Sequence, residues 1–171
     1  MVALLIYLDG HKIALNAMLA CLIHELGHLF IIRMFGGRVR MVNLTAVGAE
    51  INPEYRKPLP YRKELITAVA GPLANILFAV ASAGVGQYLF TGFNLCFGLL
   101  NLLPIHALDG GRILACCLNV HCFFVAESIC RFISTLFSGI MLGLGFAAWR
   151  VLGNLTLLVT AIWLVVNTLK N

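Results

Sequence analysis

The stretch Leu22-Ile23-His24-Glu25-Leu26-Gly27-His28-Leu29-Phe30 places an H-E-x-x-H pattern inside an apolar run. On a helix, residues four apart lie on one face, so the imidazoles of His24 and His28 can reach a single ion. Glu25 directly follows the first histidine, where its carboxylate can take a proton from a metal-activated water. The pattern therefore predicts two ligands of a zinc site and a general base beside them.

The surroundings of this motif are as apolar as a membrane helix. The run Ile13–Phe35 contains few ionisable residues: His24, Glu25, His28 and Arg33. Its length, about 23 residues, matches a bilayer-spanning helix. A carboxylate at the centre of such a helix costs about 2.5–3.5 kcal/mol, whereas zinc binds small peptides with about 10–16 kcal/mol. A bound metal is therefore expected; the alternative is two histidines satisfied by polar neighbours in a helix bundle.

Composition sets the class of protein. Hydrophobic residues make up 61% of the 171 residues, charged residues only 11%, and the mean hydropathy is +0.95. A soluble domain of this size could not bury so much apolar surface. We expect an all-α polytopic membrane protein, one membrane-embedded domain over residues 1–171 with about five transmembrane or membrane-embedded helices.

The net charge of +5 does not indicate nucleic-acid binding, because the basic residues are few and gather in one polar connection. Seven of the twelve Lys and Arg residues lie there: Arg33, Arg38, Arg40, Arg56, Lys57, Arg62 and Lys63. By the positive-inside rule this Arg33–Lys63 connection is cytoplasmic. The expected location is a lipid bilayer, with the metal helix entering from outside and ending in the cytosol.

The segments on either side of the metal helix differ in character. Met1–Leu8 is apolar but too short to span, and Asp9–Lys12 is expected to stop it, leaving a flap or a shallow segment. After the helix, Arg38–Ile51 alternates larger apolar residues with polar or small ones, which indicates a strand or hairpin. Such a strand could pair with an extended substrate peptide through its free edge. A simple connecting hairpin is an equally good interpretation.

A second span is expected from Leu65 to about Phe90. Gly71 and Ala74 would allow close helix contact, and Pro72 frees a backbone carbonyl. Asn75 is a polar group at membrane depth and needs a partner. It is expected to bond another helix, with a hydrogen bond to a substrate backbone as the less favoured alternative.

The third span begins near Phe93 and breaks at mid-membrane within Asn101–Leu114, which holds a proline and two adjacent glycines. Irregular backbone at that depth is tolerated around a site or a cavity. A catalytic zinc takes three protein ligands and leaves one position open. Asp109 and His106 are the candidates for the third ligand. Asp109 is favoured because the two glycines free its backbone to turn toward the ion, whereas His106 more readily lines a cleft.

Two further apolar runs, Phe132–Trp149 and Leu155–Leu169, predict the last helices. Glu127 and Arg131 stand four residues apart, which predicts a surface ion pair. The six cysteines show no C-x-x-C spacing, and the adjacent Cys116 and Cys117 could not pair without strain. They are expected to be small buried hydrophobic residues.

The combination of His24-Glu25-Leu26-Gly27-His28 with Gly71-Pro72-Leu73-Ala74-Asn75 and Asn101-Leu102-Leu103-Pro104…Leu108-Asp109-Gly110-Gly111 resembles the site-2 protease family of intramembrane zinc metalloproteases. The similarity covers about residues 13 to 120, and it is greatest to the compact bacterial sporulation type, which processes a sigma-factor precursor. No PDZ-like insert, CBS domain or complete span ahead of the metal helix is visible.

This resemblance implies that His24, His28 and Asp109 hold one zinc ion, that Glu25 activates water, and that Asn75 and Asn101 help to position substrate. The implied activity is regulated intramembrane proteolysis of a membrane-associated protein or peptide, such as a sigma-factor precursor or an anti-sigma factor. A regulatory membrane protein is a possible further partner, and a bacterial cell membrane is the implied location. Two alternatives are an inactive relative that sequesters a membrane protein and a metal transporter or sensor.

Overall fold

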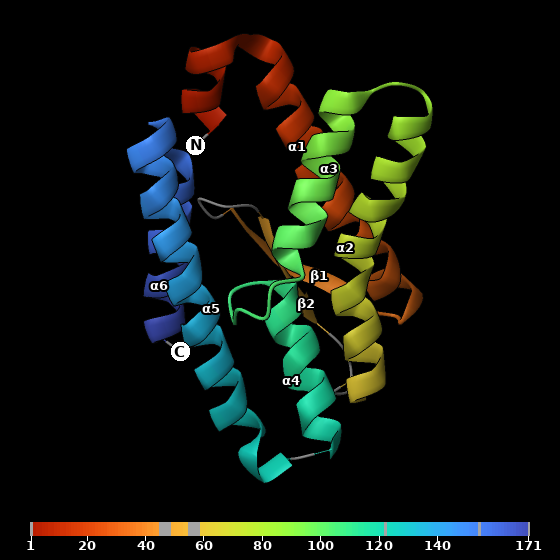
Figure 1. Cartoon of the computed structure of the whole chain (residues 1–171). Helices are drawn as coiled ribbons and strands as arrows, with labels where there is room; N and C mark the ends of the chain where they lie inside the picture. Colours follow the sequence, from red (N-terminus) through yellow and green to blue (C-terminus); the bar gives the residue numbers. More distant parts are fainter. Residues whose placement is uncertain (1, 45–48, 55–58, 122, 154, 171) are drawn as a thin grey trace. The chain divides into compact units, whose positions relative to one another are not determined.

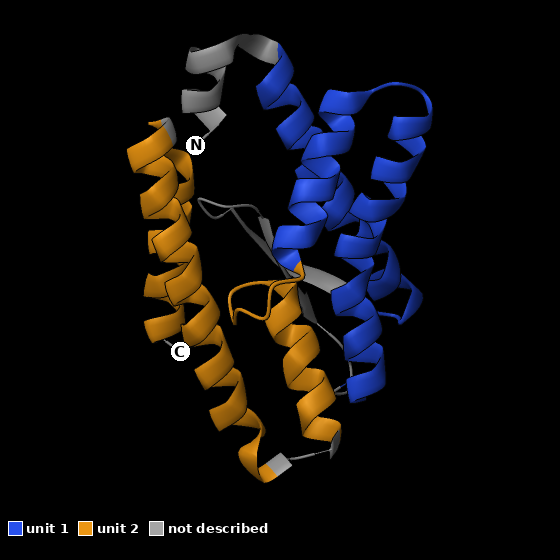
Figure 2. Cartoon of the chain, in the orientation of Figure 1, with its two compact units in different colours: residues 1–101 blue, residues 102–171 orange. Residues whose placement is uncertain are grey.

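Figure 1 shows the computed structural model of the chain, which describes residues 2–44, 49–54, 59–121, 123–153 and 155–170. Clustering of contacts divides it into two compact units, residues 1–101 and residues 102–171 (Figure 2). The elements are, in order, α1 (Val2–Met34), β1 (Arg38–Leu44), β2 (Ala49–Glu54), α2 (Tyr61–Gly84), α3 (Tyr88–Asn101), α4 (Asp109–His121), α5 (Phe123–Leu152) and α6 (Leu155–Lys170). Whether the two units fold as the one expected domain stays a prediction.

Helix α1 begins earlier than the sequence suggested. It runs from Val2 to Met34 without a break, so the expected stop at Asp9–Lys12 is wrong. Gly10 is the one strongly unfavourable residue of that segment, and it costs about 1 kcal/mol in a helix interior. A helix that is already propagating gains one hydrogen bond per added residue and can pass such a point.

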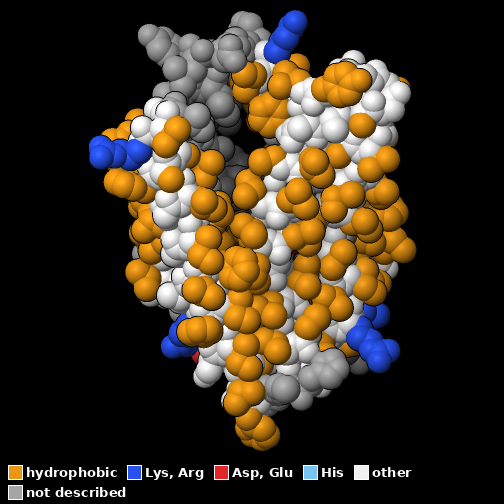
Figure 3. Space-filling view, viewed as in Figure 1, with side chains coloured by type: hydrophobic (Ala, Val, Ile, Leu, Met, Phe, Trp, Pro, Cys, Tyr) orange, Lys and Arg blue, Asp and Glu red, His pale blue; other side chains and the backbone are white. Residues whose placement is uncertain are grey.

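Helix α1 exposes large apolar side chains and buries polar ones, which is the reverse of a surface helix in a water-soluble protein. Large apolar side chains are exposed along one face, with Leu22 at 53%, Leu26 at 50% and Phe30 at 66%. The imidazoles of His24 and His28 are buried, at 4% and 7% exposure. Burying polar rings while exposing leucines suits a helix whose outer surroundings are hydrocarbon. Hydrophobic side chains likewise cover most of the surface seen in Figure 3.

Among the described residues, three helices are long and apolar enough to cross a membrane: Lys12–Met34, Tyr61–Gly84 and Phe124–Val151. Helices α3 and α6 have 14 and 16 residues, and at 1.5 Å per residue they reach about 21 and 24 Å. Both are shorter than the hydrocarbon core of about 30 Å. Of the expected five or so spanning or embedded helices, three candidates are therefore confirmed by length and composition. The others stay a prediction.

In the first unit, β1 and β2 pair antiparallel, with Val42 opposite Ile51 and an irregularity between Val39 and Met41. Their connection, residues 45–48, lies outside the described residues, so the hairpin as a whole stays a prediction. The next span differs in its boundary from the expected Leu65–Phe90. Helix α2 ends at Gly84, and Gly86, at φ +75°, turns the chain into α3.

Helices α1 and α2 approach closely where two small residues meet. A methyl group built on Gly27 would lie 2.7 Å from the Ala70 carbonyl oxygen and 2.9 Å from Cβ of Ala74. Close helix contact was expected at Gly71 and Ala74, and Ala74 makes it with Gly27. Small residues of this kind let helix backbones approach in membranes, where packing replaces the hydrophobic effect as the driving force.

The second unit begins with the predicted break. Residues 102–108 lie between α3 and α4 and are not helical, which confirms the interruption; its depth in a membrane stays a prediction. Helices α5 and α6 contain the two predicted apolar runs. They are joined by a buried hydrogen bond between the hydroxyls of Ser138 and Thr168, 3.0 Å apart. The predicted ion pair of Glu127 and Arg131 is also present, at 2.9 Å.

The close approach of α1 and α2 predicts a stability effect. Gly27→Ala should lower the melting temperature of the detergent-solubilised protein, because overpacking of this kind costs about 1–3 kcal/mol. Gly92→Ala is the matched control, since a methyl group there meets nothing within 4 Å. Equal melting temperatures for Gly27→Ala and the wild type would show that the two helices can separate without cost.

Candidate metal centre

His24 and His28 lie side by side on the buried face of α1, as their spacing predicts. Their ring centroids are 4.7 Å apart and the rings are nearly perpendicular, at 82°. The two Nε2 atoms are 3.1 Å apart. The structure therefore brings together two ring nitrogens of one helix that could bind the same metal ion.

The other ring nitrogen of each histidine contacts a carbonyl oxygen on α2. Nδ1 of His28 is 2.8 Å from the backbone oxygen of Thr67, and Nδ1 of His24 is 2.8 Å from Oδ1 of Asn75. A carbonyl oxygen can only accept a hydrogen bond, so each Nδ1 donates and carries the proton. In the neutral form of each ring, Nε2 is then the nitrogen without a proton and can bind a metal.

When both rings are neutral, the two Nε2 atoms each present a lone pair toward the same point. Two ligands of a tetrahedral zinc ion, each about 2.0–2.1 Å from the metal, stand about 3.3–3.4 Å apart. The observed 3.1 Å requires only a slight opening to reach that value. The chemistry and spacing of this donor pair fit a divalent zinc ion.

Small and aromatic residues shape the space around the rings. A methyl group on Gly71 of α2 would collide with Nε2 of His28, so glycine is what leaves room for that imidazole. Phe97 of α3 meets His24 edge to face, with centroids 5.4 Å apart. This apolar wall lowers the local polarity and strengthens any charge interaction at the two rings.

Asn75 has a different set of contacts from the substrate contact implied by family resemblance. Its side chain is fully buried. Its Nδ2 donates to the Ala20 carbonyl at 2.9 Å and to Oδ1 of Asn94 at 3.0 Å, while its Oδ1 accepts from His24. Bonding to another helix was the favoured expectation, and the structure shows it. The substrate contact that the resemblance implies for Asn75 stays a prediction.

Asn94 is the residue that sequence reasoning missed. It was passed over inside an apolar segment, although a fully buried asparagine needs partners as much as Asn75 does. The available signal was its polarity at depth in Tyr88–Asn101, a helix otherwise rich in large apolar residues.

Asp109 is the first residue of α4 and is buried, with 8% exposure. The expected role of the glycines that follow is wrong: neither Gly110 nor Gly111 has a positive φ. A methyl group on Gly110 would collide with the carbonyl oxygens of Leu102 and Leu103, and one on Gly111 with that of Ile105. The two glycines give room for the preceding backbone to fold against the first turn of α4. Ligation by Asp109 stays a proposal.

The remaining predicted residues have local contacts. Glu25 is half-buried on α1, one residue beyond His24. Asn101, the last residue of α3, donates from Nδ2 to the Phe97 carbonyl at 3.0 Å. His106 is exposed, its backbone N–H donates to Oγ of Ser134 at 3.0 Å, and it lines a cavity of about 520 Å³ within the second unit. The roles of Glu25 and Asn101 stay predictions.

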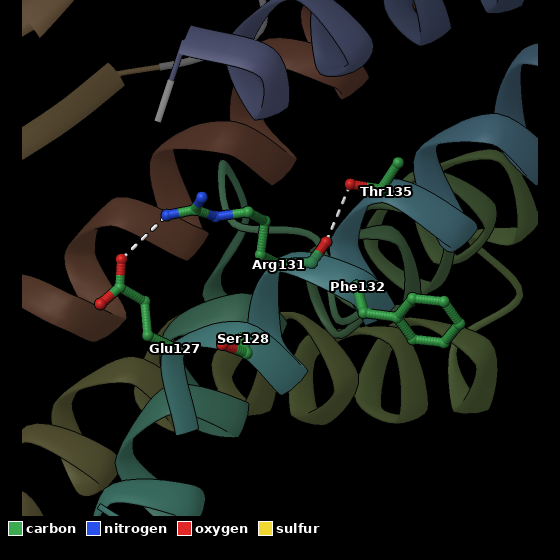
Figure 4. A pocket seen from close by; sticks show the side chains of 5 residues that line it. All are labelled: Glu127, Ser128, Arg131, Phe132 and Thr135. Atoms are coloured by element: carbon green, nitrogen blue, oxygen red, sulfur yellow. Dashed lines mark hydrogen bonds and ion pairs between the residues drawn. The ribbon is translucent and has the colours of Figure 1, made fainter. Parts of the chain in front are cut away.

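A second cavity of the same unit is built from one helix (Figure 4). Its lining comes from α5: Glu127, Ser128, Arg131, Phe132 and Thr135. The ion pair of Glu127 and Arg131 is mostly exposed, at 86% and 63% of their side chains, so it contributes no more than about 1 kcal/mol. This groove holds no group of metal-binding side chains. The five described cysteines form no disulfide. Cys116 is buried, Cys21 and Cys130 are half-buried, and Cys96 and Cys117 are exposed, so the expected burial is confirmed only for Cys116; Cys122 lies outside the described residues.

Fold and site together define a class: a helical protein with apolar helices long enough to span a membrane and a buried pair of histidines suited to zinc. Residues 12–93 match the model of Peptidase family M50. The solved Site-2 Protease from Methanocaldococcus jannaschii has the same fold, with a TM-score of 0.74 and 21% identity over 99% of this chain and 83% of that one.

Two curated proteins also match the sequence. Stage IV sporulation protein FB of Bacillus subtilis is 36% identical over 123 residues, which cover 66% of this chain and 43% of that protein. A zinc metalloprotease of Methanocaldococcus jannaschii is 28% identical over 109 residues, 57% of this chain and 31% of the relative. The chain thus spans less than half the length of these relatives. Residues 12–93, just under half of this chain, thus resemble Peptidase family M50, and the fold is that of a solved site-2 protease.

The contact between Gly71 and His28 generates a prediction about metal affinity. Gly71→Ala should displace the His28 ring and weaken zinc binding by about 5- to 150-fold, the equivalent of an overpacking cost of about 1–3 kcal/mol. Competition with a chromogenic chelator measures this in detergent. Gly84→Ala, also on α2, is the control because its methyl group meets nothing within 4 Å. Unchanged affinity in Gly71→Ala would mean that the ring is free to move.

Proposed function

We propose that this protein is an intramembrane zinc metalloprotease that hydrolyses a peptide bond of a membrane-associated protein. The observation that carries the proposal is the pair of Nε2 atoms of His24 and His28, 3.1 Å apart on the buried face of α1, with each Nδ1 on a carbonyl oxygen. The match of residues 12–93 to the model of Peptidase family M50 supports the same chemistry. The similarity to a named zinc metalloprotease supports zinc as the metal.

We propose Asp109 as the third ligand of one zinc ion. His24, His28 and Asp109 are all buried and each offers a donor atom that zinc accepts. His106, on the non-helical segment just before α4, is the alternative nitrogen ligand, but its exposure and its place at the cavity of the second unit favour another role. A set of three protein ligands leaves one position open for chemistry.

Glu25 is proposed as the general base. Its position next to His24 on α1 gives its carboxylate access to a water in front of the histidine pair, and it would take the proton of that water as the scissile carbonyl is attacked. The same carboxyl group would then protonate the leaving amine. Zinc, when bound, would supply Lewis-acid polarisation of the carbonyl and of the attacking water. Asn101 is proposed to help hold the substrate backbone.

Substrate binding is proposed at the two-stranded sheet of the first unit. In the described part of the chain this sheet contains only β1 and β2, so each strand has a second edge at which an extended peptide could add. A helical substrate must unwind before cleavage, because its carbonyls are otherwise engaged in the helix. Addition to a strand edge would hold it in the extended form.

Orientation and pathway are also proposals. The end of α1 and the start of α2 meet, since the Lys63 ammonium lies over the Phe35 ring at 5.1 Å from its centroid. Arg33, Arg62 and Lys63 are exposed there, which supports a cytoplasmic side in a bacterial cell membrane. The similarity to a sporulation protein makes a sigma-factor precursor or an anti-sigma factor the first substrates to test, with a regulatory membrane protein as a further partner.

The catalytic assignment predicts a separation of binding from turnover. Glu25→Gln should retain zinc but lower cleavage of a co-expressed membrane substrate by about 10²- to 10⁴-fold, the usual contribution of a general base. Zinc content and cleaved product are measured on the same membranes. Glu127→Gln is the control, since its carboxylate pairs with Arg131 on the surface of α5. Cleavage at the wild-type rate by Glu25→Gln would overturn the mechanism.

The ligand assignment predicts a different pattern. Asp109→Ala should lose bound zinc, whereas His106→Gln should keep it. Anomalous scattering at the zinc edge or elemental analysis of the purified protein distinguishes the two. Loss of zinc in His106→Gln and its retention in Asp109→Ala would reverse the assignment, and a wild-type protein that binds no zinc would refute the proposed function.

A further inference from the structure

Asn94 of α3 anchors a chain of hydrogen bonds that ends on a histidine. Its Nδ2 donates to the backbone carbonyl of Phe90, one turn earlier in the same helix, at 3.0 Å. Because that carbonyl can only accept, the amide nitrogen of Asn94 must face it. The amide oxygen, Oδ1, therefore points the other way, toward α2.

The order of donor and acceptor along the chain of hydrogen bonds continues through Asn75. Its Nδ2 donates to Oδ1 of Asn94 and to the Ala20 carbonyl. Reversing the Asn75 amide would place its oxygen against these two acceptors, and a buried polar group left without a partner costs about 1–3 kcal/mol. Oδ1 of Asn75 is thus left to accept from Nδ1 of His24 at 2.8 Å.

The packing around this chain fixes its geometry. Asn75 and Asn94 are fully buried. Gly98, one turn beyond Asn94, lets α3 approach Asn75, because a methyl group there would lie 3.2 Å from both Cβ of Asn75 and the Pro72 carbonyl oxygen. Neither asparagine can turn away to solvent, so the direction of each bond is set by backbone carbonyls of α1 and α3.

We infer that Asn94 is a positioning residue of the proposed metal centre: through Asn75 it holds His24 in the tautomer that carries its proton on Nδ1 and presents Nε2 as the nitrogen that would bind zinc. The inference rests on the proposed function only in naming the metal. His28 needs no such relay, because its Nδ1 donates directly to a backbone carbonyl. Residues that orient a metal-binding histidine in this way typically account for about 10- to 100-fold in metal affinity.

The test compares two substitutions of Asn94. Asn94→Leu keeps the approximate shape but removes the acceptor for Asn75, so the Asn75 amide can turn and zinc affinity should fall by about 10- to 100-fold. Asn94→Asp, neutral when buried in apolar surroundings, can still donate to Phe90 and accept from Asn75, and it should restore most of that affinity. Asn119→Leu is the matched control, since Asn119 makes the same bond within its own helix, to the Ala115 carbonyl at 2.9 Å.

A tautomer measurement distinguishes this role from a loss of packing. Nitrogen-15 spectra of histidine-labelled, metal-free protein, recorded at alkaline pH where imidazoles are neutral, report which ring nitrogen carries the proton. The His24→Ala variant assigns the signals. The wild type and Asn94→Asp should show His24 protonated at Nδ1, and Asn94→Leu should show a mixture of both tautomers.

Two results would overturn the inference. One is a wild-type His24 protonated at Nε2, a result that needs no variant to fold. The other is zinc affinity in Asn94→Leu within about twofold of the wild type, because a relay of this kind should account for at least tenfold. A different result would refute the proposed function but not this inference. In that case the wild-type protein would bind no zinc or cleave no substrate, while His24 would still carry its proton on Nδ1.

Discussion

The close opposition of two imidazole nitrogens in an apolar environment is the constraint on which the first unit depends. Nε2 of His24 and Nε2 of His28 are 3.1 Å apart, and carbonyl oxygens hold the proton of each ring on the opposite nitrogen. Two lone pairs held at this distance repel each other, and burial removes the water that would screen them. When both rings are neutral, a zinc ion bound by the two nitrogens, as proposed, would relieve this repulsion.

This constraint explains where the small residues stand. Gly71 leaves room for the His28 ring, Gly27 brings α1 against α2, and Gly98 brings α3 against Asn75. Each glycine lies within a helix, where it costs about 1 kcal/mol relative to alanine. Glycine is nevertheless needed at these positions, because polar groups on different helices can meet only if the backbones approach closely. Lipid supplies no alternative hydrogen-bond partners.

Local pattern predicted those parts of the molecule that depend on neighbours in the sequence. The spacing of His24 and His28 gave their common face, and the spacing of Glu127 and Arg131 gave their ion pair. Proline and glycine density gave the break after Asn101. Errors arose where a residue has two possible functions. Gly110 and Gly111 were interpreted as giving backbone freedom, but they give space for a neighbouring backbone, and no local pattern separates these two functions.

The role of Asn75 shows the limit of such reasoning more clearly. Its polarity at depth indicated that it needs a partner, but the identity of that partner depends on a contact with His24, 51 residues earlier, and on Asn94, 19 residues later. A sequence pattern gives the need for a hydrogen bond and not its direction. Direction arises from the packed helices, because only there do fixed backbone carbonyls of Ala20 and Phe90 decide which end of each amide faces which neighbour. The position of the proton on His24 is therefore a property of three helices together, although both histidines belong to one.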